Sequence, residues 1–134
     1  MTKIAYSAEV ASATKAGQNT KIYDLEDRTY QFAKGCRDFI KKLFKTISNI
    51  EYGKQLTRSS GSQAANYIEA NEAISRKDFF YRIKICRKET KESRLWLRLC
   101  DIQGKITLEK ERDNLIGEAT ELMKIFGSIV EKNK

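Results

Sequence analysis

The sequence predicts an all-α protein, an antiparallel up-down-up-down four-helix bundle. Its 134 residues contain no proline, the residue that most often interrupts a helix. Four segments carry apolar residues at alternating spacings of three and four, which is the period of an α-helix. No comparable stretch alternates with the period of a strand. Because short breaks separate the segments, consecutive helices are expected to lie antiparallel.

The first two predicted helices differ in how strongly their residues favour a helix. The first, 25–43, has an apolar face made of Leu25, Thr29, Phe32, Cys36, Phe39 and Leu43. The second, roughly 48–72, reads RSSGSQAAN at its centre and has poor helix propensity. Its inner face is predicted to contain Gly53, Leu56, Ser60, Ala64, Tyr67 and Asn71. We expect packing to hold this helix, with Ser48 or Asn49 as its N-cap.

The last two predicted helices have clearer ends. Ser75 is expected to cap the third, with Asp78 completing a pattern like a capping box, and Gly104 follows its end. Its inner face is Phe79, Ile83, Cys86, Thr90, Ser93, Leu97 and Cys100. The fourth is expected to start at Thr107, with an inner face of Leu108, Arg112, Leu115, Ala119, Leu122, Phe126 and Ile129.

The rest of the organisation is simple. Residues 1–20 show no sustained pattern and are predicted to be a flexible N-terminal extension, with residues 21–134 forming the bundle domain. No run approaches the roughly 18 apolar residues of a membrane span, and the N-terminus lacks a secretory signal. We therefore expect a cytoplasmic protein with no membrane partner.

The residue types in this sequence give little support for a catalytic or metal site. The chain has no histidine, which removes the usual general base and the common nucleophile pairs. Three Glu-x-x-Glu pairs (69/72, 89/92 and 118/121) permit an all-carboxylate metal site, but ion pairs with nearby Lys and Arg are favoured. The three cysteines fall on apolar faces and are expected to be buried. We predict no enzyme, no cofactor and no metal.

Positive charge is concentrated in one segment. The whole chain carries a net +8, and residues 76–105 hold ten Lys or Arg against four acids. A row at helical spacing follows the inner face of the third helix, and residues near the end of the first helix add to it. The candidate nucleic-acid-binding residues are Lys84, Arg87, Lys88, Lys91, Arg94, Arg98, Lys41, Lys42 and Lys45. An ordinary solvated helix face is the alternative.

Apolar residues outside the inner faces predict self-association, because a monomeric bundle needs only one apolar face per helix. The candidate oligomer-interface residues are Phe80, Trp96, Leu99, Ile116, Met123 and Val130.

One stretch, RSSGSQAANYIEANEAISRKDFFYRIKICRKETKESRLWLRL (58–99), resembles the four-helix-bundle proteins encoded in intervening sequences of 23S ribosomal RNA genes. The most specific residues are Arg58, Ser62, Asn66 and Glu69, followed by SRKDF and the run from Glu89 or Glu92 to Leu97. Ala70 departs from the glycine found in part of that family.

The resemblance implies an antiparallel bundle that assembles as a basic homopentamer, without an established enzymatic activity. A similar fold occurs in the accessory variability protein of diversity-generating retroelements, which is thought to bind nucleic acid and a reverse transcriptase. The helical spacing of Arg58, Asn66 and Glu69 suggests a polar network on one side of the second helix.

Two functions remain open at this point. The first is a non-enzymatic homo-oligomer that binds structured RNA or DNA through the basic row. The second is a structural or adaptor oligomer whose partners are itself and another protein.

Overall fold

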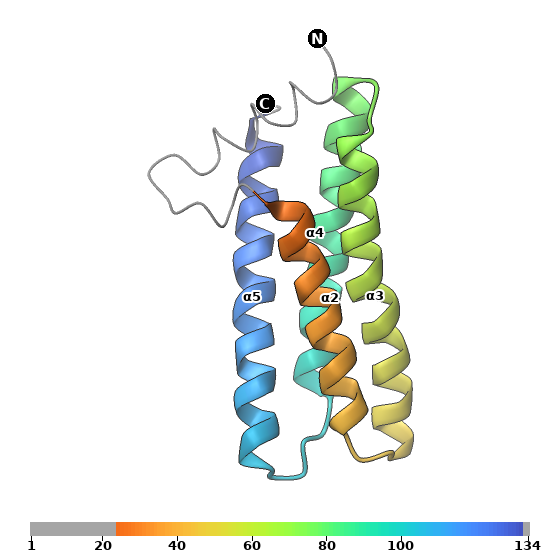
Figure 1. Ribbon diagram of the computed structural model, residues 1–134, viewed down its shortest axis with the longest axis vertical. Coiled ribbons are helices and arrows are strands. Elements are labelled where there is room, and N and C mark those ends of the chain that lie inside the picture. Colours follow the sequence, from red (N-terminus) through yellow and green to blue (C-terminus); the bar gives the residue numbers. More distant parts are fainter. Residues whose placement is uncertain (1–23, 133–134) are drawn as a thin grey trace.

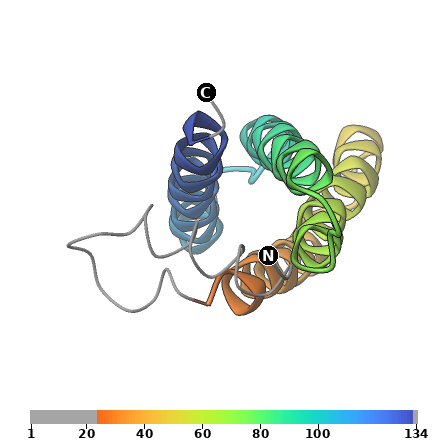
Figure 2. The same ribbon diagram turned by 90° about the horizontal axis from the view of Figure 1, so that it is seen from above.

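The computed structural model describes residues 24–132, so the predicted extension 1–20 lies outside the described residues. Within this range the helices are α2 (Leu25–Lys42), α3 (Ile47–Asn71), α4 (Arg76–Leu99) and α5 (Ile106–Glu131). Consecutive helices run in opposite directions (Figure 1). Seen end-on, they form a ring in the order α2, α3, α4, α5, and each helix packs against two neighbours (Figure 2). The predicted four-helix bundle is confirmed.

Three of the four described helices start at a side chain that accepts a backbone N–H group. The exception is α5, which begins at Ile106, before the predicted Thr107, and has no side-chain cap. Asp24 caps α2, and its Oδ1 lies 2.9 Å from the backbone N of Asp27. Ser75 caps α4 as predicted, with its Oγ 3.0 Å from the backbone N of Asp78. The predicted cap of α3 was wrong: Thr46 accepts the backbone N–H of Asn49 at 3.1 Å, so the helix begins before Ser48.

The core contains the predicted apolar faces. Every residue of the faces predicted for 25–43 and 79–100 is buried. The other two faces are buried less completely, since Ala64, Asn71, Arg112 and Leu115 are half-buried. The three cysteines are free and buried, as expected.

Small polar groups fill the contact between α3 and its neighbours. The hydroxyls of Ser59 and Ser93 lie 2.8 Å apart, both fully buried between α3 and α4. Gln63 donates from Nε2 to the Thr29 carbonyl oxygen on α2 at 2.8 Å. These contacts explain why a segment of poor helix propensity is helical: its small side chains pack and bond across the bundle.

Two further contacts fix the ring. Arg28 of α2 donates to both carboxylate oxygens of Glu118 on α5, at 2.7 and 2.9 Å. The buried side chain of Asn49 donates to the carbonyl oxygens of Phe44 and Asp101, and accepts the backbone N–H of Asp101. Asn49 therefore joins the α2–α3 loop to the α4–α5 loop. None of the helices described is long and apolar enough to cross a membrane.

Candidate nucleic-acid interface

The basic row of α4 lies on the helix surface that faces outward and toward α5. Lys84, Arg87, Lys88, Lys91 and Arg98 are exposed, whereas Arg94 is half-buried. Arg94 donates from Nη1 to the hydroxyl of Thr120 on α5 at 3.1 Å. Arg87 also lies beside α5, because a Cβ added at Gly127 would be 3.9 Å from its Nη1. The structure thus brings these six predicted residues onto one continuous side of α4.

The positive charge of this row is not neutralised within the part of the chain that the structure describes. None of the six side chains lies within 4.0 Å of a carboxylate oxygen there. In total α4 carries nine basic and three acidic residues. The row is therefore a surface of positive potential that can attract a polyanion.

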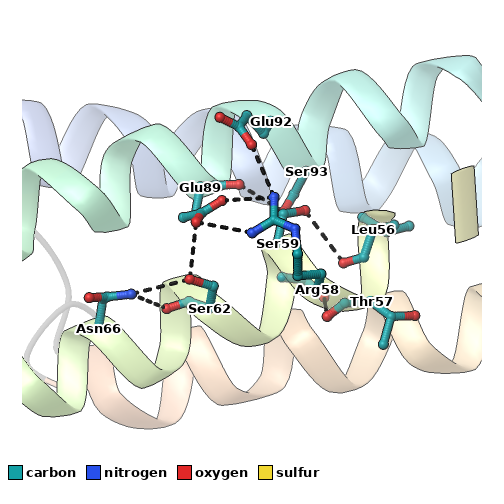
Figure 3. A network of polar contacts seen from close by, with 10 residues as sticks. Leu56, Thr57, Arg58, Ser59, Ser62, Asn66, Glu89, Glu92 and Ser93 are labelled. Atoms are coloured by element: carbon teal, nitrogen blue, oxygen red, sulfur yellow. Dashed lines mark hydrogen bonds and ion pairs between the residues drawn. The ribbon is translucent and has the colours of Figure 1, made fainter. Parts of the chain in front are cut away.

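Two of the three acids of α4, Glu89 and Glu92, point away from the row, toward α3. Glu89 is buried, and its carboxylate accepts from Arg58 Nη1 at 3.3 Å, from Arg58 Nη2 at 3.4 Å and from Ser62 Oγ at 3.1 Å. Glu92 accepts from Arg58 Nη2 at 3.2 Å (Figure 3). The hydrogen bonds and charge of Glu89 raise the pKa of Arg58. The cation that offsets these two acids thus comes from α3 and not from the basic row.

The polar contacts extend along the α3–α4 contact in a line that we call the α3–α4 polar seam. Asn66 donates from Nδ2 to the backbone carbonyl and hydroxyl oxygens of Ser62, at 2.9 and 3.2 Å. Arg82 of α4 donates from Nη1 to Asn66 Oδ1 at 3.1 Å. The seam therefore runs from Arg82 through Asn66, Ser62 and Glu89 to Arg58 and Glu92.

The predicted network of Arg58, Asn66 and Glu69 needs one correction. Glu69 is exposed, and Arg58 bonds to Glu89 and Glu92 instead. Arg58 and Glu69 share a side of α3 but are eleven residues apart, about 16 Å along the axis, which is beyond the reach of the two side chains. The carboxylate that completes the network comes from another helix.

The predicted lysines of the first helix are not part of the row. Lys41 and Lys45 are exposed, and Lys42 forms an ion pair of 3.0 Å with Glu111 of α5. Lys41 and Lys42 lie at the C-terminal end of α2, and Lys45 lies in the loop that follows it. This helix sits across the ring from α4 (Figure 2).

The predicted interface residues occupy different environments. Phe80 and Val130 are buried in the core, so the expectation that they face another chain is corrected. Trp96 stacks on Tyr52 of α3, with ring centroids 6.0 Å apart, and it packs with Ile116 against the core. Met123 is half-buried, and Leu99 is 43% exposed.

Exposed apolar side chains that the sequence reasoning missed lie elsewhere. Tyr30 and Phe44 flank the outer side of α2, and Ile50 and Ile68 flank that of α3; all four are more than 40% exposed. Around each helix they fall between the inner face and the polar positions. Their only signal in the sequence was therefore an apolar residue outside the inner face.

Most carboxylates of the Glu-x-x-Glu pairs form ion pairs with Lys or Arg, which is the interpretation that the sequence favoured. Glu89 and Glu92 pair with Arg58, Glu118 with Arg28, and Glu121 with Lys124. Among residues 24–132, no group of three His, Cys, Asp or Glu side chains is placed to hold a metal ion.

Comparison with known proteins identifies similar chains. A family model described as 23S rRNA-intervening sequence protein matches residues 8–128, a range that begins inside the predicted extension. A crystal structure from Bacteroides thetaiotaomicron, described as a protein with unknown function from the S23 ribosomal protein family, is 30% identical. The match covers 79% of this chain and 97% of that one, with a TM-score of 0.65. No curated protein matches the chain.

Proposed function

The chain belongs to the 23S rRNA-intervening sequence protein family, and from this premise we propose that it is a non-enzymatic nucleic-acid-binding protein. It acts in the cytoplasm as a homo-oligomer, and it binds structured RNA or DNA through the basic row of α4. The number of five copies, which the sequence resemblance implies, is part of the proposal.

The observation that carries this proposal is the separation of charge around α4. The buried Glu89 and the neighbouring Glu92 are held by Arg58 on the α3 side, while five of the six side chains in the row from Lys84 to Arg98 are exposed. A solvated helix face would normally be supported by ion pairs with acids three or four residues away. In α4 only Glu92 has such a spacing, four residues after Lys88, and its carboxylate contacts Arg58 of α3 instead, so the row is left to attract phosphates.

The length and chemistry of the row suit a nucleic-acid backbone. Lys84 and Arg98 are 14 residues apart, about 21 Å along the helix axis. Arg side chains can donate two parallel hydrogen bonds to one phosphate, whereas Lys acts as a point charge. Such contacts are independent of base sequence, so binding should depend strongly on salt and weakly on sequence.

The descriptions of similar proteins support RNA as the first ligand to test. One refers to 23S rRNA and the other to a ribosomal protein family. Neither description includes an enzymatic activity.

The test is a fluorescence-anisotropy titration of the full chain. A structured rRNA fragment and a duplex DNA serve as ligands, at salt concentrations from about 50 to 200 mM. We expect both ligands to bind, with an affinity that falls steeply as salt rises. An absence of binding to either ligand at the lowest salt concentration would contradict the proposal.

A second function is favoured by the exposed apolar residues of α2 and α3. An adaptor that binds only protein would use these side chains, because exposed apolar patches commonly mark protein contacts. A chain that self-associates but binds neither RNA nor DNA at low salt would support this alternative.

A further inference from the structure

The end of the bundle where α2 joins α3 carries a hollow of about 380 Å³, which we call the loop-end hollow. Its apolar lining consists of Ile40 of α2, Leu43 and Phe44 of the following loop, and Ile50 of α3. Gly53 also lines it, and a Cβ added there would lie 3.2 Å from Ile40 Cγ2, so this glycine lets the two helices approach closely. The loop-end hollow can therefore receive an apolar group.

The two uncharged polar side chains of the lining, Asn49 and Thr57, form their hydrogen bonds within the chain. Asn49 donates to the carbonyl oxygens of Phe44 and Asp101, which uses both of its amide hydrogens. The hydroxyl of Thr57 donates to the carbonyl oxygen of Gly53 at 2.8 Å. Neither side chain therefore has a hydrogen left to donate to a ligand.

The charged side chains of the lining are Lys45 and Lys54, and both are exposed. Lys45 lies within 4.0 Å of no carboxylate oxygen among residues 24–132. Lys54 forms an ion pair of 3.3 Å with Glu51, and exposed pairs of this kind contribute little to stability. Both ammonium groups can therefore bind an anionic ligand.

Two neighbouring features add positive potential to the loop-end hollow. The Nζ atom of Lys105, at the start of α5, lies 4.4 Å from the centroid of the Phe44 ring. The first turn of α3 contains no acid, so the positive end of its helix dipole is not compensated there. An occupant of the hollow should therefore be acidic as well as apolar.

Apolar surface continues beyond the hollow itself. Ile47 is 86% exposed and precedes Ile50 by three residues, so both lie on the same side of α3. Ile106 is 67% exposed and directly follows Lys105, the lysine over the Phe44 ring. A segment of protein suits this surface better than a small molecule, because its successive side chains can fill the hollow and cover these isoleucines.

We propose that the loop-end hollow is the docking site for an acidic segment of a different protein. A large apolar side chain of that segment fills the hollow, and its Asp or Glu side chains lie beside Lys45 and Lys54. Asn49 joins the two loops and so shapes the site before the partner binds, which lowers the cost of binding. No lining residue belongs to α4, so this partner goes beyond nucleic-acid binding and leaves the basic row free.

The first step of the test identifies a peptide probe. A random-peptide phage library is panned against the full chain, and the most enriched peptide is synthesised with a fluorescent label. We expect the enriched sequences to combine Phe, Leu or Ile with Asp or Glu. The absence of enrichment, or enriched sequences without acidic residues, would overturn the proposal.

Fluorescence anisotropy then measures the affinity of this peptide for variants with wild-type helicity by circular dichroism. Lys45→Glu/Lys54→Glu should weaken binding by about tenfold or more, because like charges then face each other. Ile47→Ser should weaken binding roughly fivefold through the lost apolar contact. Wild-type affinity in both variants would overturn the proposal.

Matched controls show whether the loss belongs to the hollow. Lys34→Glu/Lys124→Glu makes the same charge change at two exposed positions outside the lining, and it should keep the affinity. Ile74→Ser should also keep it, because Ile74 is 94% exposed at the opposite end of α3. Losses in these controls equal to those in the hollow variants would contradict the site.

Other occupants give different results. Peptide binding that is lost in Lys91→Glu/Arg98→Glu but kept in Lys45→Glu/Lys54→Glu would place the peptide on the basic row and overturn the site. So would an Ile47→Ser particle whose mass differs from the wild type by sedimentation equilibrium, since the surface would then join copies of the chain. Binding to anionic phospholipid vesicles that requires Lys45 and Ile47, without any peptide binding, would replace the protein partner by a lipid surface.

The same variants separate this inference from the proposed function. Lys45→Glu/Lys54→Glu should bind duplex DNA like the Lys34→Glu/Lys124→Glu control. A chain that binds the peptide through the hollow but binds no nucleic acid would support the docking site and remove the nucleic-acid function. A chain that binds DNA but enriches no peptide would overturn the docking site alone.

Discussion

Arg58 of α3 and Glu89 of α4 form a two-pronged contact across the bundle, with nitrogen–oxygen distances of 3.3 and 3.4 Å. The Glu89 side chain is only 10% exposed, whereas that of Arg58 is 52% exposed. The pair therefore closes the α3–α4 contact from its solvent side. It also removes an acid from the surface of α4, and no side chain of the basic row lies within 4.0 Å of a carboxylate oxygen among residues 24–132.

Replacing Glu89 should destabilise the fold more than replacing Glu69. Glu89→Ala leaves Arg58 and Ser62 without their acceptor, and we expect a loss of about 1–3 kcal/mol in the free energy of unfolding. The larger cost of breaking a fully buried pair, about 3–5 kcal/mol, does not apply because Arg58 is half exposed. Glu69→Ala is the matched control and should change stability by less than about 0.5 kcal/mol. Urea denaturation measures both, and equal losses would contradict the role given to the seam.

Asn49 should be needed to hold the two loops together. Asn49→Ala removes three hydrogen bonds to Phe44 and Asp101, and it leaves the partly buried backbone groups of both residues without this partner. We expect a loss of about 1–3 kcal/mol. Ser48→Ala, an exposed change one residue earlier, is the control. Hydrogen exchange should also accelerate at the Asp101 amide in Asn49→Ala, and unchanged exchange there would argue against the contact.

The buried thiols should make the protein less stable at high pH. Burial raises the pKa of Cys36 and Cys86 from 9.0 to about 12, and that of Cys100 to about 11. Between pH 9 and these values the unfolded chain loses thiol protons that the folded chain keeps. The free energy of unfolding therefore falls as pH rises through this window, and the thiol contribution is fully present below pH 9.

This thiol effect can be isolated with one variant. In Cys36→Ala the fall in stability above pH 9 should be shallower than in the wild type, although the baseline stability is lower. At neutral pH, a thiol reagent should label the three cysteines only in denaturant. Rapid labelling of the folded protein would contradict their burial.

The fold was predictable because the apolar pattern that specifies each helix lies within the sequence of that helix. The inner faces of α2 and α4 follow the helical period so closely that every predicted position is buried. Phe80 and Val130 were misassigned for a physical reason: each helix in the ring packs against two neighbours. This geometry buries a wider sector than one stripe, so residues beside the stripe can belong to the core.

The candidate site was only partly predictable. The positions of the basic row follow from spacing within α4, and the structure places them on one side. The partner of Arg58 depends on the register between α3 and α4, which spacing within a single helix does not contain. The same limit applies to the cap of α3, where Thr46, Ser48 and Asn49 are all suitable residues and the loop geometry selects Thr46.

The central claim, that the basic row of α4 binds phosphates, is tested most directly by the salt dependence of DNA binding. In Lys91→Glu/Arg98→Glu, both side chains are exposed, and the slope of log affinity against log salt should become shallower by about 0.9 for each lost contact. The matched control is Lys110→Glu/Lys124→Glu, which makes the same charge change on α5. We predict a shallower slope and weaker binding in the first variant alone, with duplex DNA and RNA both affected. Equal slopes in the wild type and both variants would contradict the claim.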